Sequence, residues 1–105
     1  MSLEVRFSAE AAAEFADLAA WYEGQDPGLG KPFVGAVEAT IGFMAGWPGL
    51  GSLVPGVGGD LEIRRAPVRR FPYHVVYAVL HDHLRVLAVA HDRRLPTYWA
   101  SRTGE

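Results

Sequence analysis

The chain has 105 residues, of which half are hydrophobic and 21% are charged. This length supports one modest core and is too short for two, so we expect a single domain over residues 1–105. The absence of cysteine excludes a disulfide framework and thiolate metal sites. No apolar run approaches the roughly 18 residues that a membrane span needs, and no export signal opens the chain, so we expect a cytoplasmic protein.

The net charge of −2 hides an asymmetry between the two halves of the chain. Residues 1–60 carry two basic and eight acidic side chains, whereas residues 61–105 carry eight arginines and four acidic side chains. The first half is therefore strongly acidic and the second half is basic. We expect an anionic partner to bind the C-terminal half.

The N-terminal half predicts one short strand followed by two helices. Polar and apolar residues alternate in Glu4-Val5-Arg6-Phe7, and Ser8 is a good N-cap for a helix over about residues 9–23. Pro32 suits the first turn of a second helix over about residues 31–45. Apolar side chains recur at helical spacing in both segments, which indicates that each helix buries one face.

The C-terminal half predicts a loop and then three strands. Residues 46–59 hold six glycines and two prolines and are expected to form one long loop. Residues 61–68, 73–80 and 84–91 have the pattern of strands, with a tight antiparallel turn between the last two. The expected fold is α+β with the order β-α-α-β-β-β, in which two helices cover one face of a small, mainly antiparallel sheet.

The arginines of the C-terminal half are the first candidates for a binding site. The guanidinium group is planar and permanently charged, which suits phosphate, and aromatic rings can stack on unpaired bases. Consecutive strand residues point to opposite faces, so at most about half of these arginines share a surface, and we still expect the open face of the sheet to be basic. The alternative is that they only solvate that face and pair with nearby acids. The candidate binding residues are Arg64, Arg65, Arg70, Tyr98 and Trp99.

Histidines in the predicted hairpin indicate a possible acid–base centre. If the turn pairs residues whose numbers sum to 165, His74 lies directly opposite His91 on one face, close to Arg93. Two imidazoles beside an arginine are suited to moving protons at a phosphodiester. A register slip of one residue breaks this pairing, and a single strand histidine is usually structural. The candidate catalytic residues are His74, His91 and Arg93.

The sequence supports neither a metal site nor a cofactor. His81 and His83 flank Asp82 in a turn, and no cysteine or carboxylate cluster accompanies them. The glycines of residues 56–59 precede a strand and lack the helix N-terminus that a phosphate-binding loop needs. We therefore expect no metal and no cofactor.

Several segments resemble the RelE/ParE superfamily of toxins, also described as plasmid-stabilisation proteins. The strongest are residues 69–79 (RRFPYHVVYAV) and 84–99 (LRVLAVAHDRRLPTYW). Residues 21–23 (WYE), 27–33 (PGLGKPF) and 47–51 (WPGLG) are also similar, so the resemblance spans nearly the whole chain in order. It implies a growth-inhibiting toxin of a type II toxin–antitoxin system. It also implies a cognate antitoxin that wraps the toxin with an extended, partly helical segment.

The resemblance implies two possible targets. ParE-like members inhibit DNA gyrase by binding, whereas RelE-like members cut mRNA in the ribosomal A site. In the RelE pattern an arginine follows the tyrosine of the middle strand, and His74 occupies that position here. A later arginine matches Arg93, and the next aromatic matches Tyr98 or Trp99. The histidine favours gyrase inhibition; ribosome-dependent mRNA cleavage is the alternative, and an inactive or purely antitoxin-binding member is the second alternative.

Overall fold

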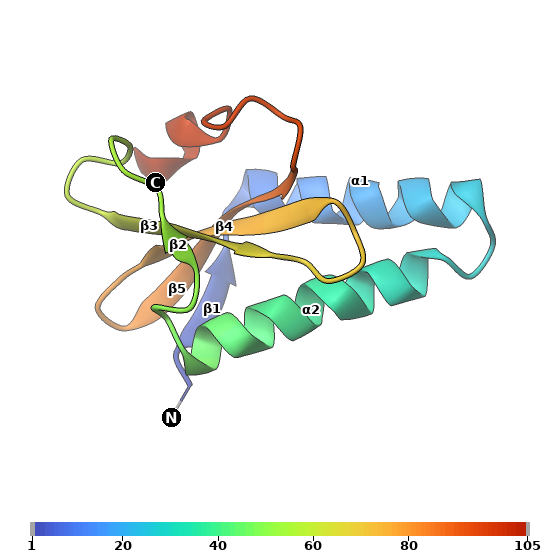
Figure 1. The fold of residues 1–105 in the computed structure, drawn as a ribbon, viewed down its shortest axis with the longest axis horizontal. Helices are drawn as coiled ribbons and strands as arrows, with labels where there is room; N and C mark the ends of the chain where they lie inside the picture. Colours follow the sequence, from blue (N-terminus) through green and yellow to red (C-terminus); the bar gives the residue numbers. More distant parts are fainter. Residues whose placement is uncertain (1, 105) are drawn as a thin grey trace.

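A computed structural model of the chain describes residues 2–104 and shows a helical hairpin packed against a twisted sheet (Figure 1). The predicted order of one strand, two helices and three further strands is confirmed, with two short elements added. The elements are β1 (Glu4–Phe7), α1 (Ala9–Gln25), α2 (Gly30–Gly46), β2 (Ser52–Leu53), β3 (Glu62–Pro67), β4 (Tyr73–Val79), β5 (His83–His91) and the 3-10 helix η1 (Ala100–Gly104).

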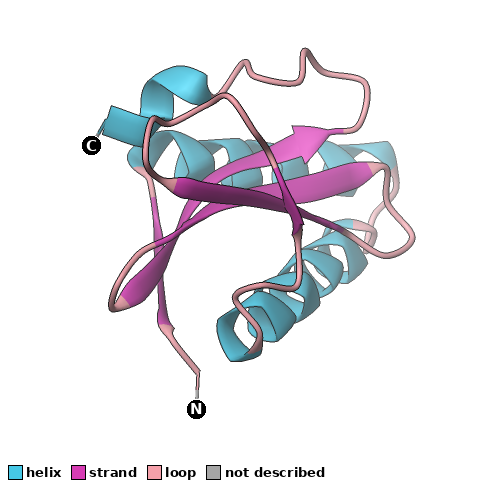
Figure 2. Cartoon of the chain, turned by 60° about the vertical axis from the view of Figure 1, so that its left-hand side comes forward, coloured by secondary structure: helices cyan, strands magenta, loops and turns pink. Residues whose placement is uncertain are grey.

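The sheet has the strand order β1-β5-β4-β3-β2. β1 runs parallel to β5, and the other neighbouring strands are antiparallel. This pairing agrees with the prediction of a mainly antiparallel sheet. Ser8 ends β1 because its side chain accepts a hydrogen bond from the Ala11 N–H and so caps α1. Figure 2 shows how the strands cross one another and where the two long helices pack.

The main core lies between the helices and the sheet. Phe33 and Val37 of α2 are fully buried against Val75 and Tyr77 of β4. Aromatic rings from both layers meet at one end of this core, where the Tyr73 and Phe33 centroids lie 5.4 Å apart. Burial raises the pKa of Tyr73 to about 12.

The second face of the sheet is also covered, so the expectation of an open basic face is wrong. Ile63, Val76 and Leu87 form a second core with Trp99, which the C-terminal segment brings back over the strands. Figure 1 shows this segment arching from the end of β5 back along the sheet. The physical reason is that both faces of β4 and much of β5 are apolar, so each face needs a covering layer.

The segment 46–59 is not one long loop, because β2 lies inside it as a two-residue edge strand. Tyr77 holds the start of this segment: its hydroxyl oxygen accepts from the Gly51 N–H and donates to the Pro48 carbonyl, both at 2.9 Å. A Cβ at Gly51 would lie 2.6 Å from the Arg65 carbonyl oxygen. Glycine is therefore required where the loop packs against β3.

Glu23 holds the turn between the helices and gives the fold a pH-dependent contact. Its carboxylate accepts the N–H groups of Gly28 and Gly30 at 2.8 and 3.0 Å, and these bonds lower the pKa of Glu23 below its ordinary 4.5. Because the folded-state pKa is depressed, this contribution to stability is present above the unfolded-state pKa and is lost as the pH falls through the folded-state value.

We expect Glu23→Gln to lower the free energy of unfolding at about pH 7 and to change it little at about pH 3. Urea unfolding at the two pH values measures this difference. Asp17→Asn, which alters an exposed carboxylate of the same helix, is the matched control and should show no such pH dependence. An equal loss for Glu23→Gln at both pH values would contradict the assignment.

Candidate target-binding surface

Five arginines gather at one end of the sheet. Pro67 pairs with His74 and Tyr73 pairs with His91, so the end of β3, the start of β4 and the end of β5 are neighbours. The Asp92 N–H donates to the Pro72 carbonyl at 2.9 Å, which joins the turn after β5 to the loop before β4. We call this group the basic rim: Arg65, Arg69, Arg70, Arg93 and Arg94.

Much of the basic rim is available to a partner. Arg69, Arg70 and Arg93 are exposed, and within residues 2–104 their side chains form no hydrogen bond or ion pair. Arg70 has a φ of 73°, in the left-handed region that non-glycine residues rarely adopt. Such backbone strain is concentrated at functional sites, where the surrounding structure maintains it. The loop before β4 is therefore a candidate contact point.

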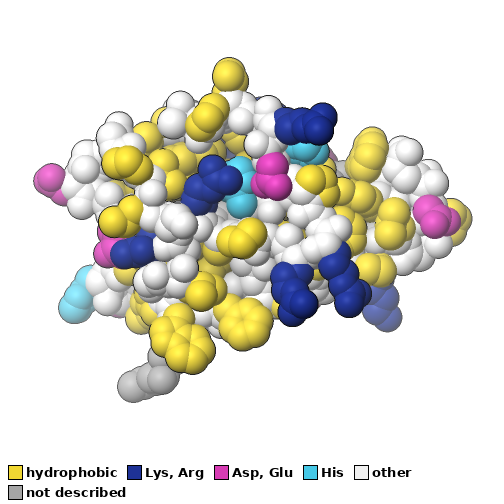
Figure 3. Space-filling view, viewed as in Figure 1, with side chains coloured by type: hydrophobic (Ala, Val, Ile, Leu, Met, Phe, Trp, Pro, Cys, Tyr) yellow, Lys and Arg dark blue, Asp and Glu magenta, His cyan; other side chains and the backbone are white. Residues whose placement is uncertain are grey.

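The basic side chains do not form one continuous field. On the face drawn in Figure 3 they stand in small separate groups, with hydrophobic and uncharged atoms between them. Such a surface offers several positive contact points to a macromolecule rather than one concave site for a small anion.

His74 adjoins the basic rim but is itself buried, with only 7% of its surface exposed. Its Nδ1 lies 2.9 Å from a carboxylate oxygen of Asp92 and 3.5 Å from a guanidinium nitrogen of Arg65. One ring nitrogen cannot donate to Asp92 and accept from Arg65 together, and the nearer carboxylate favours a proton on Nδ1. The guanidinium of Arg65 therefore keeps its donors for an external partner.

The predicted pairing of His74 with His91 is wrong by one residue. His74 lies opposite Ala90, and His91 lies opposite Tyr73. Neighbouring strand residues point to opposite faces, so the two histidines lie on different sides of the sheet. The His91 ring packs 5.1 Å from the Tyr73 ring, and its Nδ1 accepts the Arg93 N–H at 3.0 Å.

The turn and an irregular pairing explain this register. The turn between β4 and β5 contains only two residues, because the Leu80 N–H donates to the His83 carbonyl at 3.0 Å. The pairing then shifts between Val76 and Tyr77, where β5 contains one residue more than β4. The sequence predicts a tight turn here, but neither its exact position nor the bulge is visible in the periodicity.

Three predicted binding residues have structural contacts instead. Arg64 donates to the Gly51 carbonyl at 2.6 Å and so secures the loop before β2. Trp99 is 1% exposed, and its burial leaves no ring surface for base stacking. Tyr98 donates to Glu14 at 2.6 Å; burial first, and then this hydrogen bond, raise the pKa of Tyr98. Arg65 and Arg70 remain exposed on the basic rim.

Two apolar grooves flank α2. The first, the α2–β3 groove, encloses about 510 Å³ and is lined by Ala36, Phe43, Leu50 and Pro67 among others. Phe43 and Leu50 are more than half exposed, as are nearby Trp47 and Leu53. Sequence periodicity identified the buried stripe of α2 but not this second, exposed apolar surface.

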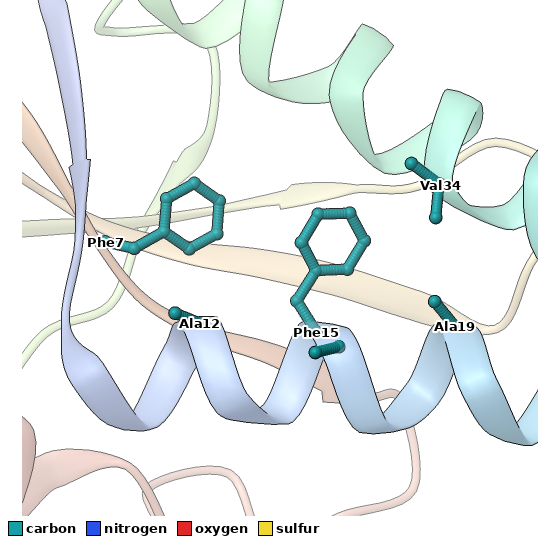
Figure 4. Close-up of a pocket in the computed structure, with 6 residues that line it drawn as sticks. Phe7, Ala12, Phe15, Ala19 and Val34 are labelled. Carbon is teal, nitrogen blue, oxygen red and sulfur yellow. The ribbon is translucent and has the colours of Figure 1, made fainter.

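The second groove, the α1–α2 groove, encloses about 330 Å³ between the two helices and β1. Figure 4 shows the side chains of Phe7, Phe15 and Val34 directed into the gap, with Ala12 and Ala19 along its wall. Contiguous exposed apolar surface of this kind marks protein interaction sites. An extended partner that crosses α2 could reach both grooves.

No helix within residues 2–104 is long and apolar enough to cross a membrane. In the same part of the chain, no three His, Cys, Asp or Glu side chains are grouped so that they could hold a metal ion.

Comparisons with known proteins identify the family. No curated protein sequence matches the chain. A solved structure titled "Chromosomal ParDE TA system from P. aeruginosa" superposes with a TM-score of 0.70 at 18% identity, over 86% of this chain and 96% of that chain, and so confirms the fold. Residues 5–96 match the family described as "ParE toxin of type II toxin-antitoxin system, parDE". The chain therefore belongs to the ParE toxin family of type II toxin–antitoxin systems.

Proposed function

We propose that this ParE-family toxin arrests growth by binding DNA gyrase and that the basic rim makes the contact. The observation that carries the proposal is that Arg69, Arg70 and Arg93 are exposed at one end of the sheet and that their side chains have no partner within residues 2–104. Guanidinium groups in this arrangement bind the carboxylates of an acidic protein surface or the phosphates of gyrase-bound DNA. Electrostatic complementarity also speeds encounter with a large anionic target.

The separation of the catalytic candidates supports binding rather than RNA cleavage. General acid–base catalysis requires both proton-transfer groups within hydrogen-bond reach of the reacting atoms. His91 lies on the face opposite His74, and its Nδ1 is occupied by the Arg93 N–H. Ribosome-dependent mRNA cleavage is the second candidate, favoured by one observation: Asp92 orients His74 beside Arg65.

The family implies an antitoxin partner, and we propose that this antitoxin covers the two grooves that flank α2. The α2–β3 groove and the α1–α2 groove lie on opposite sides of one helix and are lined mainly by apolar side chains. A segment that folds on binding gains most by burying apolar anchors in such grooves. Arg69 belongs to the basic rim and also lines the α2–β3 groove, so on this proposal the antitoxin and gyrase contact surfaces that meet at Arg69.

Alanine variants of the rim test the proposed contact. We expect Arg65→Ala, Arg70→Ala and Arg93→Ala together to weaken gyrase inhibition by about tenfold or more, because each removes a charge from the contact. Antitoxin affinity should change by less than about twofold. Arg6→Ala is the matched control, since Arg6 is an exposed arginine on β1, at the opposite edge of the sheet from β2 and β3.

The outcome is measured by inducing each variant in bacteria with and without the antitoxin, and by supercoiling assays on the purified proteins. A triple variant that arrests growth as strongly as the wild type would show that the rim is not the contact. Mapping of transcript 5′ ends in the same cells tests ribosome-dependent mRNA cleavage. Cuts at codon-related positions in translated mRNA would favour the ribosome as target.

A further inference from the structure

One edge of β5 is completed by side chains instead of a strand. In the described chain, β1 pairs with β5 only from His83 to Val86. Beyond that point the Val89 N–H donates to a carboxylate oxygen of Glu14 at 2.9 Å, and the Leu87 carbonyl accepts from Arg102 at 2.9 Å. A residue of α1 and a residue of η1 thus satisfy backbone groups that an edge strand leaves unpaired.

Glu14 joins this edge to the C-terminal tail, residues 95–104. One carboxylate oxygen accepts from Arg102 at 3.1 Å, and the other accepts from the Tyr98 hydroxyl at 2.6 Å. The side chains of Glu14 and Arg102 are each only 15% exposed. Hydrogen bonds to a carboxylate are strong in such a poorly hydrated setting, so Glu14 fixes the tail at a defined position.

The tail in turn positions one arginine of the basic rim. The Arg94 guanidinium carbon lies 3.9 Å from the centroid of the Tyr98 ring, at the distance of a cation–π contact. Glu14 holds the hydroxyl of that same ring. A continuous path of contacts therefore runs from α1 through Tyr98 to Arg94.

We propose that Glu14 is a positioning residue for target binding: through Tyr98 it sets where Arg94 stands on the basic rim. This inference rests on the proposed function, because it assigns Arg94 to the surface that contacts the target. It gives α1 a role in target binding although Glu14 itself lies outside the rim. It also predicts that antitoxin binding, which uses the grooves beside α2, does not depend on Glu14.

Three variants test the role of Glu14. Glu14→Ala removes every contact of the carboxylate. Glu14→Gln is the conservative variant, because its amide oxygen can accept from Val89 and its amide group can donate to the Tyr98 oxygen. Asp17→Ala is the matched control, a carboxylate of the same helix that is exposed. Tyr98→Phe removes only the hydroxyl and repeats the test if Glu14→Ala does not fold.

We expect Glu14→Ala to weaken inhibition of gyrase by about tenfold or more, the size of a lost hydrogen bond to a charged group. Antitoxin affinity should stay within about twofold, and Glu14→Gln should recover most of the inhibition. In NMR spectra, Glu14→Ala should abolish the ring-current shift of the Arg94 side-chain protons and speed hydrogen exchange of the Val89 amide. Asp17→Ala should match the wild type in every measurement.

Two results would overturn the positioning role. One is an unchanged Arg94 ring-current shift in Glu14→Ala. The other is an equal loss of target and antitoxin binding, which indicates general destabilisation. Failure of the wild-type protein to inhibit gyrase overturns the proposed function instead, and the NMR measurements still decide whether Glu14 positions Arg94.

Discussion

Replacement of Trp99 by alanine is expected to lower the free energy of unfolding by about 3–5 kcal/mol, the usual cost of deleting a large buried aromatic side chain. Trp99 is 1% exposed and packs in the second core with Ile63, Val76 and Leu87. Loss of the indole leaves a cavity and removes the apolar cover from one face of the sheet. A loss of this size is a large fraction of the total stability of a small domain.

Trp47→Ala is a matched control for Trp99→Ala, because the Trp47 side chain is 70% exposed. Its removal should change the free energy of unfolding by no more than about 0.5 kcal/mol. Guanidinium chloride unfolding followed by circular dichroism compares the two variants under the same conditions. Similar stabilities for the two would mean that the tail does not pack on the sheet in solution.

Phe43→Glu is expected to weaken antitoxin binding by about 30-fold or more, because it puts a charge at the centre of an apolar interface. Phe43 lines the α2–β3 groove and is 59% exposed, so the variant should remain folded. Calorimetric titration with the cognate antitoxin measures the change in affinity. The expected result follows from the cost of burying a carboxylate without a partner.

Leu95→Glu is the control for Phe43→Glu, since Leu95 is a highly exposed apolar residue outside both grooves. It should leave antitoxin affinity nearly unchanged. A large loss for Leu95→Glu together with no effect of Phe43→Glu would show that the antitoxin covers the C-terminal tail instead of α2.

The order of elements could be predicted because it depends on local signals. Ser8 was predicted as the N-cap of the first helix, and its side chain accepts the Ala11 N–H. The change from helical to strand periodicity near residue 60 identified the three long strands. β2 was missed because two residues are too few to show alternation, and η1 was missed because its turn depends on the packing of Trp99.

The candidate site was predicted less well, because it depends on contacts distant in sequence. Arg65 and Arg70 were identified as exposed basic residues, but composition alone could not show that Arg64 binds the loop before β2. The predicted pairing of His74 with His91 failed because it depends on the exact position of the turn and on one bulge. One usable signal was overlooked: the unbroken apolar run of β4 predicts a strand buried on both faces, and therefore a cover such as the one Trp99 provides.

The most direct test of the central claim is a DNA supercoiling assay with purified gyrase and purified toxin. We expect inhibition at roughly micromolar toxin or below, full recovery of supercoiling when the cognate antitoxin is added, and intact translated transcripts in arrested cells. Unimpaired supercoiling at saturating toxin, in a preparation that still binds its antitoxin, would contradict that claim.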